Sequence, residues 1–424
     1  MNIAVLGGGT TGLATAHYLS KKGDKITIFE KEPVLGGMSS SFKDKNWQWP
    51  LEKTYHHFFS NDQELIGLMK ETNFKNYFFR SPETASLYNI SRMFPVDTPQ
   101  DFLKLPLLPL LDKLRAGLVV FFLKASPFFP FYEKQTAETF LRKTMGERAW
   151  ISLWQELFRK KFGKNAGNIL ASFIWARIKK RTKKLGYMNG GFQSFIDHLE
   201  ITLEKKGVVI KKEMAIKNIE KKNKQFVIWY GNDQNSNFDM VVSTLPTPIL
   251  IKVGENLFPK DYLLRLKKIK YLHGTTLILQ TGKPLFEKTY WVNVNDKKLP
   301  FMVLVQHTNY IDNTYYGGQH ILYIGDYVDS DNKLLRMSAE EMVKYFLPYL
   351  KKINPNYGND LKTPYFFKTY HAQPIFDKEF LKNKPEFTTP IKNFYIANLD
   401  MTYPYDRGTN YAVATAKNLV EKYF

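Results

Sequence analysis

The hydrophobic and polar positions at the start of the chain predict a strand, a turn, a helix and a second strand. Residues 2–6 form a short apolar run of the kind found in buried strands. Residues 13–22 follow a glycine-rich turn and place apolar side chains on one face of a helix that Gly23 ends. Residues 25–29 form a second apolar strand that leads into Glu30. This order predicts the first βαβ half-unit of a parallel sheet.

The same patterns divide the rest of the chain into helical and strand-rich segments. We expect further helices in five segments: 62–72, 135–183, 190–206, 339–353 and 409–424. We expect strands in a hairpin over 87–96, at 208–219, 226–229, 240–243 and 394–397, and repeatedly across 265–330. The mixture predicts an α/β fold in which the block 265–330 supplies an antiparallel sheet to a second domain.

A glycine pattern lies between the first strand and the first helix. Gly7, Gly9 and Gly12 follow the spacing Gly-x-Gly-x-x-Gly. The first glycine permits a tight turn, the second lets the backbone approach a pyrophosphate, and the third lets the helix pack on the strand. Phosphates would then meet free N–H groups at the positive end of the helix. Glu30 is placed to accept hydrogen bonds from a ribose, and its charge disfavours the 2′-phosphate of NADP.

Further motifs decide between NAD and FAD because they resemble those of a flavoprotein family. Residues 36–39 read Gly-Gly-Met-Ser, residues 190–192 form a Gly-Gly-Phe turn before a helix, residues 207–219 form a Gly-Val-Val-Ile strand region, and residues 395–412 precede and open the last helix. With the glycine pattern, these segments resemble the flavin-dependent amine oxidase superfamily, which includes protoporphyrinogen oxidase and phytoene desaturase. The resemblance implies FAD as the cofactor and a last helix whose N-terminus faces the isoalloxazine ring.

The resemblance also implies a cofactor site and a domain organisation. We expect these residues to contact FAD: Gly7, Gly9, Thr10, Thr11, Gly12, Glu30, Lys31, Gly36, Gly37, Met38, Ile216, Asp400, Gly408, Thr409, Asn410 and Tyr411. We expect residues 1–75, 186–250 and 386–424 to form a Rossmann-like FAD-binding domain, a parallel sheet with helices on its faces. It is interleaved with an α+β substrate domain of residues 76–185 and 251–385, which contains the antiparallel sheet.

The candidates for substrate contact are less specific. His57 follows the cofactor-wrapping segment, and its surroundings loosely resemble a histidine patch near the flavin of UDP-galactopyranose mutase, a flavoenzyme of related fold. His307 and Asn309 come at the end of a predicted strand, and Arg407 lies beside the flavin-binding ending. We take these four as candidate catalytic residues, and a purely structural role stays open for each. Flavin dehydrogenation needs a well-placed C–H bond in a dry pocket more than a strong acid or base.

Composition and charge narrow the chemistry. The 424 residues include no cysteine, which excludes disulfides, thiol relays and iron–sulfur clusters held by thiolates. The eight histidines show no His-x-x-x-His spacing, so we expect no metal site and assign any redox chemistry to an organic cofactor. The net charge of +21 fits either an anionic partner or a lysine-rich solvated surface, and no nucleic-acid-binding motif accompanies it.

Residues 101–132 carry short apolar stretches separated by lysine and arginine, with phenylalanines between prolines. This pattern fits a lid that makes peripheral contact with an anionic membrane, and it fits a buried helix pair equally well. No stretch reaches the roughly 18 uninterrupted apolar residues that a membrane-spanning helix needs. We therefore expect a cytoplasmic protein, with or without attachment to the cytoplasmic face of the membrane.

Two hypotheses for the function follow. The first is an FAD-dependent oxidoreductase that dehydrogenates a small lipophilic or membrane-held molecule by hydride transfer to flavin N5. The alternative is a redox-neutral, flavin-dependent mutase of a nucleotide- or lipid-linked sugar, similar to UDP-galactopyranose mutase. The pattern specifies neither the electron acceptor nor the oligomeric state.

Overall fold

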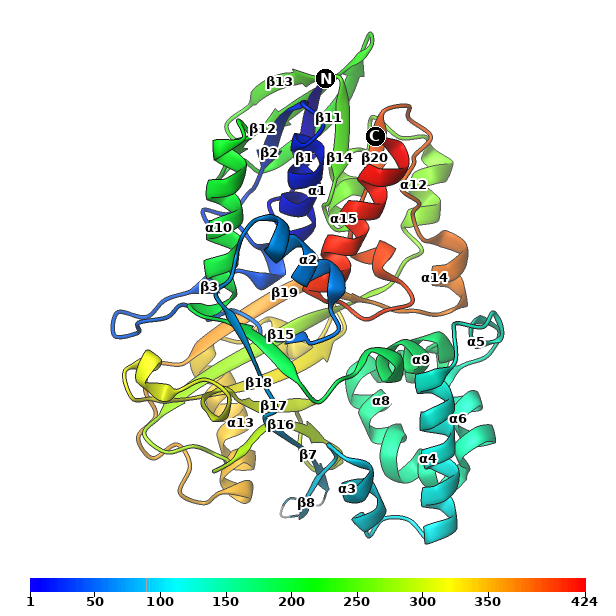
Figure 1. The fold of residues 1–424 in the computed structure, drawn as a ribbon, viewed down its shortest axis with the longest axis vertical. Coiled ribbons are helices and arrows are strands. Elements are labelled where there is room, and N and C mark those ends of the chain that lie inside the picture. The colour runs from blue at the N-terminus through cyan, green and yellow to red at the C-terminus, as the bar shows by residue number, and fades with distance from the viewer. Residues whose placement is uncertain (89, 91) are drawn as a thin grey trace.

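The computed structural model describes residues 1–88, 90 and 92–424, and a five-stranded parallel sheet contains the first strand of the chain (Figure 1). The strands lie in the order β10 (Val209–Lys211), β2 (Lys25–Phe29), β1 (Asn2–Leu6), β14 (Met240–Ser243) and β20 (Phe394–Ile396). Ile3 is in register with both Ile26 and Met240. The predicted opening βαβ unit is present, and strands from distant parts of the chain complete the sheet.

The alternation of side chains along β1 explains why both faces of this sheet are covered. Ile3 and Val5 are fully buried in one cluster with residues of helices α1 (Thr10–Ser20), α10 (Gly191–Lys205) and α15 (Thr409–Tyr423). Ala4 and Leu6 are fully buried in another, with residues of the antiparallel strands β11 (Ile216–Lys222), β12 (Gln225–Tyr230) and β13 (Gln234–Phe238). Successive side chains of a strand point to opposite faces, so a doubly covered strand is apolar throughout.

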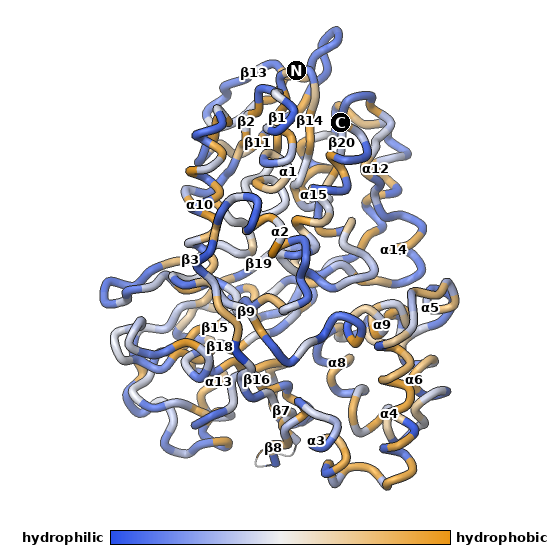
Figure 2. Tube along the Cα trace, in the orientation of Figure 1, coloured by the Kyte–Doolittle hydropathy of each residue, from blue (hydrophilic) through white to orange (hydrophobic). Residues whose placement is uncertain are grey.

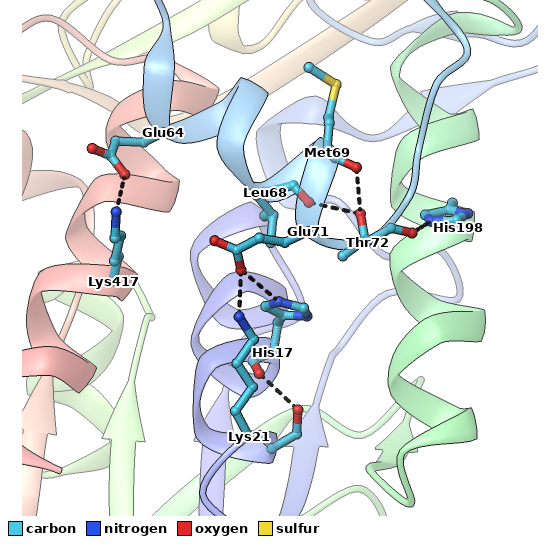
Figure 3. Close-up of polar contacts among 10 residues, drawn as sticks. His17, Lys21, Glu64, Leu68, Met69, Glu71, Thr72, His198 and Lys417 are labelled. Carbon is cyan, nitrogen blue, oxygen red and sulfur yellow. Dashed lines mark hydrogen bonds and ion pairs between the residues drawn. The ribbon is translucent and has the colours of Figure 1, made fainter.

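Polar contacts fasten helix α2 (Gln63–Glu71) to the helices around it (Figure 3). The Glu71 carboxylate accepts a hydrogen bond from Lys21 Nζ at 2.6 Å and lies 3.2 Å from His17 Nε2 of α1. Lys417 of α15 forms an ion pair with Glu64 at 3.0 Å. Burial lowers the pKa of His17 to about 4, so its imidazole is neutral at pH 7 and donates to Glu71.

A seven-stranded sheet lies below the parallel sheet in Figure 1. Its order is β19 (Tyr365–Pro374), β15 (Tyr271–Thr281), β18 (His320–Val328), β17 (Val303–Gln306), β16 (Thr289–Val294), β7 (Glu83–Tyr88) and β8 (Arg92–Pro95). All neighbours in it are antiparallel except β16 and β7, which are parallel. Helix α13 (Ala339–Ile353) packs its buried residues Met342, Phe346 and Leu350 into the cluster of this sheet. The predicted antiparallel sheet is therefore present, with one parallel pair.

A group of helices lies beside this sheet and holds most of residues 99–180 (Figure 1). Its helices are α3 (Pro99–Lys104), α4 (Leu110–Ala125), α5 (Phe131–Lys134), α6 (Ala137–Met145), α7 (Glu147–Ala149), a π-helical stretch (Trp150–Gln155), α8 (Glu156–Phe162) and α9 (Ala171–Lys180). Figure 2 shows hydrophobic stretches along several of them. No helix in the described part of the chain is long and apolar enough to cross a membrane.

Small elements connect these parts. Two short sheets pair β3 (Ser41–Phe42) with β4 (Leu51–Glu52), and β5 (Phe58–Phe59) and β6 (Tyr77–Arg80) with β9 (Leu185–Met188). The remaining helices are α11 (Thr247–Val253), α12 (Lys260–Leu266) and α14 (Lys378–Asn383).

The predicted strand over 208–219 is wrong in one respect, because the segment divides between two sheets. β10 joins the parallel sheet, and β11 begins the antiparallel one. Between them Glu213 has a φ of +58°, and Met214 N donates to Glu30 O at 2.8 Å, which turns the chain along the end of β2. Three consecutive charged residues, Lys211, Lys212 and Glu213, interrupt the apolar residues at this turn, and the prediction of a single strand passed over them.

Candidate functional site

The glycine turn predicted to bind phosphate lies directly before helix α1. A Cβ built on Gly12 would lie 1.9 Å from Gly7 O, so only glycine fits where the helix meets the turn. Gly7 has a φ of +105°, which favours glycine for a different reason. The helix has no side-chain cap and no acidic residue in its first turn, so its first N–H groups and positive end stay available for an anion.

The second glycine loop lies against the first. Gly36 N donates to Gly8 O at 2.9 Å, and Gly9 and Gly36 form a parallel bridge. The predicted cofactor residues of these two loops are therefore neighbours. Thr10, also predicted, is buried with its hydroxyl 3.5 Å from Ser39.

Glu30 directly follows β2, as the pattern predicted, and its carboxylate is buried. One oxygen accepts from Gly8 N at 2.7 Å and the other from Glu32 N at 2.9 Å. Each oxygen keeps a further lone pair that a ribose hydroxyl would use. Lys31 is exposed and pairs with Glu32 at 3.1 Å, and Ile216 opens β11 close to this end of the sheet.

The segment before helix α15 carries the other predicted cofactor residues. Asp400 is buried and accepts hydrogen bonds at 2.6 Å from the hydroxyls of Thr247 and Tyr271. Both bonds use the same oxygen, and the other, Oδ1, is buried without a partner among the described residues. Burial raises the pKa of Asp400 to about 6. A buried acceptor without a donor is costly, so this atom fits a donor supplied by a bound ligand.

Helix α15 begins at Thr409, and Gly408 offers its first turn no side-chain cap. The Asn410 side chain is used elsewhere, because its Oδ1 accepts from Glu64 N and Leu65 N at the start of α2. Tyr411 stacks on Tyr405 with ring centres 4.6 Å apart and an angle of 4°. The predicted contact of Asn410 with the cofactor would therefore be made by its main chain.

His57 and Arg407 both contact residues that are distant in the sequence. His57 Nδ1 lies 3.2 Å from the Tyr290 hydroxyl, and burial lowers the pKa of His57 to about 3. Arg407 Nη1 lies 3.8 Å from Met38 Sδ of the second glycine loop, and its guanidinium lies 5.2 Å from the centre of the Tyr327 ring. These contacts place Arg407 next to the predicted cofactor residues.

The other two catalytic candidates have structural partners. His307 is buried, and its Nε2 lies 2.8 Å from the Tyr316 hydroxyl. Asn309 Nδ2 donates to Phe286 O at 2.7 Å and to Thr289 O at 3.0 Å. Burial lowers the pKa of His307 to about 3. These contacts agree with the purely structural role that the sequence left open for His307 and Asn309.

The pattern gave no signal for Glu52. Its carboxylate is fully buried and accepts from Tyr187 OH at 2.8 Å and from Phe192 N at 2.7 Å, where the Gly-Gly turn begins α10. Burial raises the pKa of Glu52 to about 7. A Cβ on Gly191 would lie 2.7 Å from Pro50 O. The segment that carries Glu52 therefore leaves no room for a side chain at this turn. An isolated glutamate in a polar stretch is ordinarily expected at the surface.

Comparison with known proteins supplies the observation that decides the family. The profile of the family described as flavin containing amine oxidoreductase matches residues 10–419, nearly the whole chain. The chain belongs to this family. The assignment confirms the predicted resemblance, the predicted cofactor FAD and the class of FAD-dependent oxidoreductase.

Individual relatives match over shorter stretches. The chain is 34% identical over 76 residues to 15-cis-phytoene desaturase of Synechococcus elongatus, which covers 18% of this chain and 16% of the relative. It is 23% identical over 293 residues to coproporphyrinogen III oxidase of Staphylococcus aureus, covering 59% of this chain and 61% of that one. The chain thus spans less than two thirds of the length of these relatives.

Solved structures share the fold over the whole length. An oxidoreductase from Methanosarcina mazei matches with a TM-score of 0.77 and 19% identity, covering 100% of both chains. A reduced UDP-galactopyranose mutase matches with a TM-score of 0.77 and 16% identity, covering 99% of this chain and 94% of the other. These likenesses confirm the predicted fold class.

The residues present fit FAD. The uncapped start of α1 and the glycines around it suit the pyrophosphate, and Glu30 suits a ribose. The unpartnered oxygen of Asp400 and the uncapped start of α15 lie on the segment that the resemblance assigns to the flavin.

Proposed function

We propose that the protein dehydrogenates a lipophilic substrate drawn from a membrane surface. Bound FAD would supply the hydride acceptor. The observation that carries the proposal is the exposed apolar face of helix α4, which packs against helices α6 and α9.

The apolar face of α4 is large for a surface helix. Its exposed members are Leu110, Leu111, Leu114, Leu118, Phe121 and Phe122, with exposed fractions from 45% to 79%. The opposite side is packed, with Ala116 and Leu123 almost completely buried. A helix with one face in the protein and an apolar face outside suits the boundary between lipid headgroups and acyl chains.

Basic residues border this face. Lys113, Arg115 and Lys124 belong to α4 and donate hydrogen bonds to carbonyl groups of neighbouring segments. Cations next to an inserted apolar face attract anionic headgroups, and the net charge of +21 acts in the same direction.

Tyr55, His57 and Trp291 form a partly buried aromatic group that suits the reacting part of a substrate. Tyr55 lies 5.2 Å and His57 5.4 Å from the Trp291 ring, measured between ring centres. Burial holds the pKa of His56 at about 4 and that of His57 at about 3, so both imidazoles are neutral at pH 7. Neutral rings suit the removal of hydride from a C–H bond, which needs orientation and exclusion of water.

The test is anaerobic reduction of the flavin. Purified yellow protein is mixed without oxygen with the lipid fraction of native host cells, and separately with the water-soluble fraction. We expect the lipid fraction to bleach the flavin absorbance and the water-soluble fraction to leave it unchanged. Bleaching by the water-soluble fraction alone would contradict a lipophilic substrate.

The same preparation distinguishes the redox-neutral alternative. A mutase would convert UDP-galactopyranose only after dithionite has reduced the flavin, and its substrate would not bleach the oxidised form. That result, with no bleaching by lipid, would replace our proposal with the sugar mutase.

A further inference from the structure

Helices α8 and α9 bring basic side chains to the segment that precedes α15. Lys161 Nζ of α8 lies 2.5 Å from the Asp406 carboxylate, and Arg177 of α9 lies 3.5 Å from the same carboxylate. Lys161 also lies 5.3 Å from the centre of the Tyr327 ring, which Arg407 approaches to 5.2 Å. One tyrosine ring and one carboxylate thus hold three cations together.

Two of the arginines have no carboxylate within ion-pair distance among the described residues. Arg407 contacts Met38 Sδ at 3.8 Å and the Tyr327 ring. Arg181 is the first residue after α9, and its Nη2 lies 3.4 Å from the Thr84 hydroxyl. Arg181 is exposed, and the Arg177 side chain is 37% exposed, so water and a ligand reach both. We call Lys161, Arg177, Arg181 and Arg407 the basic cluster.

The carboxylates around the basic cluster do not balance it. Asp406 is shared by Lys161 and Arg177. Asp97 accepts a hydrogen bond from the Thr84 hydroxyl, and that hydroxyl in turn contacts Arg181. Glu156 is engaged by Arg159 at 2.5 Å. Burial raises the pKa of Asp326 to about 7, so this side chain is partly protonated at neutral pH.

Four cations facing two carboxylates leave a local excess of positive charge beside the flavin-binding loops. Guanidinium groups bind carboxylate or phosphate oxygens through two parallel N–H groups. Leaving such a group without an anionic partner is most costly for Arg407, which is partly buried. We infer that the basic cluster binds an oxyanion of the substrate, a phosphate or a carboxylate. This inference rests on the proposed function, and it makes the substrate an anionic amphiphile.

Helix α9 connects the basic cluster to the apolar face of α4. Trp175 Nε1 donates to Ser126 O at 3.3 Å, and Lys179 Nζ donates to the carbonyls of Lys124, Ala125 and Ser126 at 2.9–3.2 Å. The end of α4 is therefore fixed on the helix that presents Arg177 and Arg181. An acyl or isoprenoid tail at α4 and an anionic head at the basic cluster fit this arrangement.

Isothermal titration of the FAD-loaded protein tests the inference, because the pyrophosphate site of the cofactor is then filled. The probes are inorganic pyrophosphate and glutarate, a dicarboxylate, which distinguish the two sources of the oxyanion. The variants are Arg177→Gln and Arg181→Gln, with Arg177→Lys to keep the charge without the planar fork. Lys183→Gln is the matched control, because Lys183 is exposed on the same segment and outside the basic cluster.

We expect saturable binding of at least one probe, weakened about tenfold or more in each Gln variant, since a hydrogen bond to a charged group typically contributes that much. Arg177→Lys should bind with intermediate affinity, and Lys183→Gln should bind like the unchanged protein. Binding of neither probe, or equal binding in all variants, would overturn the inference.

The flavin spectrum separates this outcome from failure of the proposed function. If the protein holds FAD and is bleached by the lipid fraction but binds neither anion, the proposed function stands and the basic cluster is not an anion site. If the protein binds pyrophosphate through Arg177 but no lipid bleaches its flavin, the anion site stands and the proposed reaction is wrong.

Discussion

At the residue scale, Gly12 and Gly9 have different reasons to lack a side chain. A Cβ on Gly12 would collide with Gly7 O at 1.9 Å, so glycine is needed there for the chain to fold. A Cβ on Gly9 would meet nothing closer than Gly37 Cα at 3.8 Å, and the φ of Gly9 is an ordinary −73°. The space around its Cβ does not explain why residue 9 is glycine, and we expect the approach of a pyrophosphate to be the reason.

Asp400 gives a prediction about both stability and flavin. Asp400→Ala leaves the hydroxyls of Thr247 and Tyr271 without their shared acceptor, and we expect a loss of about 2 kcal/mol in the free energy of unfolding, together with weaker FAD binding. Asp400→Asn keeps an acceptor oxygen and should lose less. Urea unfolding and the ratio of bound flavin to protein measure the two effects. Equal stability of the Ala and Asn variants would contradict the account.

His57 gives a prediction about pH. Its pKa is about 3 in the folded chain and 6.5 as a free side chain, so between these values the unfolded chain binds a proton that the folded chain does not. The stability linked to His57 is complete above pH 6.5 and is lost as the pH falls towards 3. We expect the midpoint of urea unfolding of His57→Gln to fall less steeply with acid than that of the unchanged protein.

Tyr290→Phe is the control for that measurement. It removes the hydroxyl 3.2 Å from His57 Nδ1 but leaves the other groups that pack around the partly buried imidazole. The acid dependence of this variant should match that of the unchanged protein. If His57→Gln also shows the full dependence, burial does not keep His57 neutral.

At the element scale, local patterns predicted most helices and central strands. Helix α13 has its predicted bounds, and α15 ends one residue earlier than predicted, because apolar residues recur at helical spacing and Ser338 and Gly408 mark the starts. Helix α1 begins at Thr10, three residues before its expected start, since Gly12 was assigned to the turn. Strand β19 was missed because residues 365–374 have the burial pattern of an edge strand, with alternation only partly developed.

Helix α4 gives the prediction that belongs to this scale. The double variant Leu118→Ser with Phe121→Ser removes two apolar side chains that are 70% and 71% exposed. We expect the free energy of unfolding to change by less than about 0.5 kcal/mol, because surface positions contribute little to folding. Sedimentation with phosphatidylglycerol vesicles should fall at least about tenfold, because each inserted side chain of this size contributes roughly 1.5–3 kcal/mol.

Ile201→Ser is the matched control for vesicle binding. Ile201 is 51% exposed on α10, which covers the parallel sheet and lies away from α4 in Figure 1. Its replacement should leave sedimentation unchanged. If the control reduces binding as much as the double variant does, the interaction is a general property of the surface.

At the scale of the whole molecule, the sequence indicated the two glycine loops but not that Lys161, Arg177 and Arg407 lie together. Gly7, Gly12 and Glu30 lie within one βαβ unit, so their spacing along the chain is enough to indicate a dinucleotide-binding turn. Lys161 and Asp406 are 245 positions apart and meet only because α8 packs near the end of the chain. Of the basic cluster, Arg407 was recognisable because it adjoins a family motif, while Arg177 and Arg181 looked like part of a lysine-rich surface.

The measurement that tests the central claim most directly is the flavin content of purified Gly9→Val. The variant should fold, because its Cβ comes no closer than 3.8 Å to Gly37 Cα, and it should be colourless, because its side chain fills the space that the pyrophosphate needs. Gly67→Ala, in helix α2 with no atom within 4 Å of the added Cβ, should stay yellow. A folded Gly9→Val protein that carries as much FAD as the unchanged chain would contradict cofactor binding at the N-terminal βαβ unit.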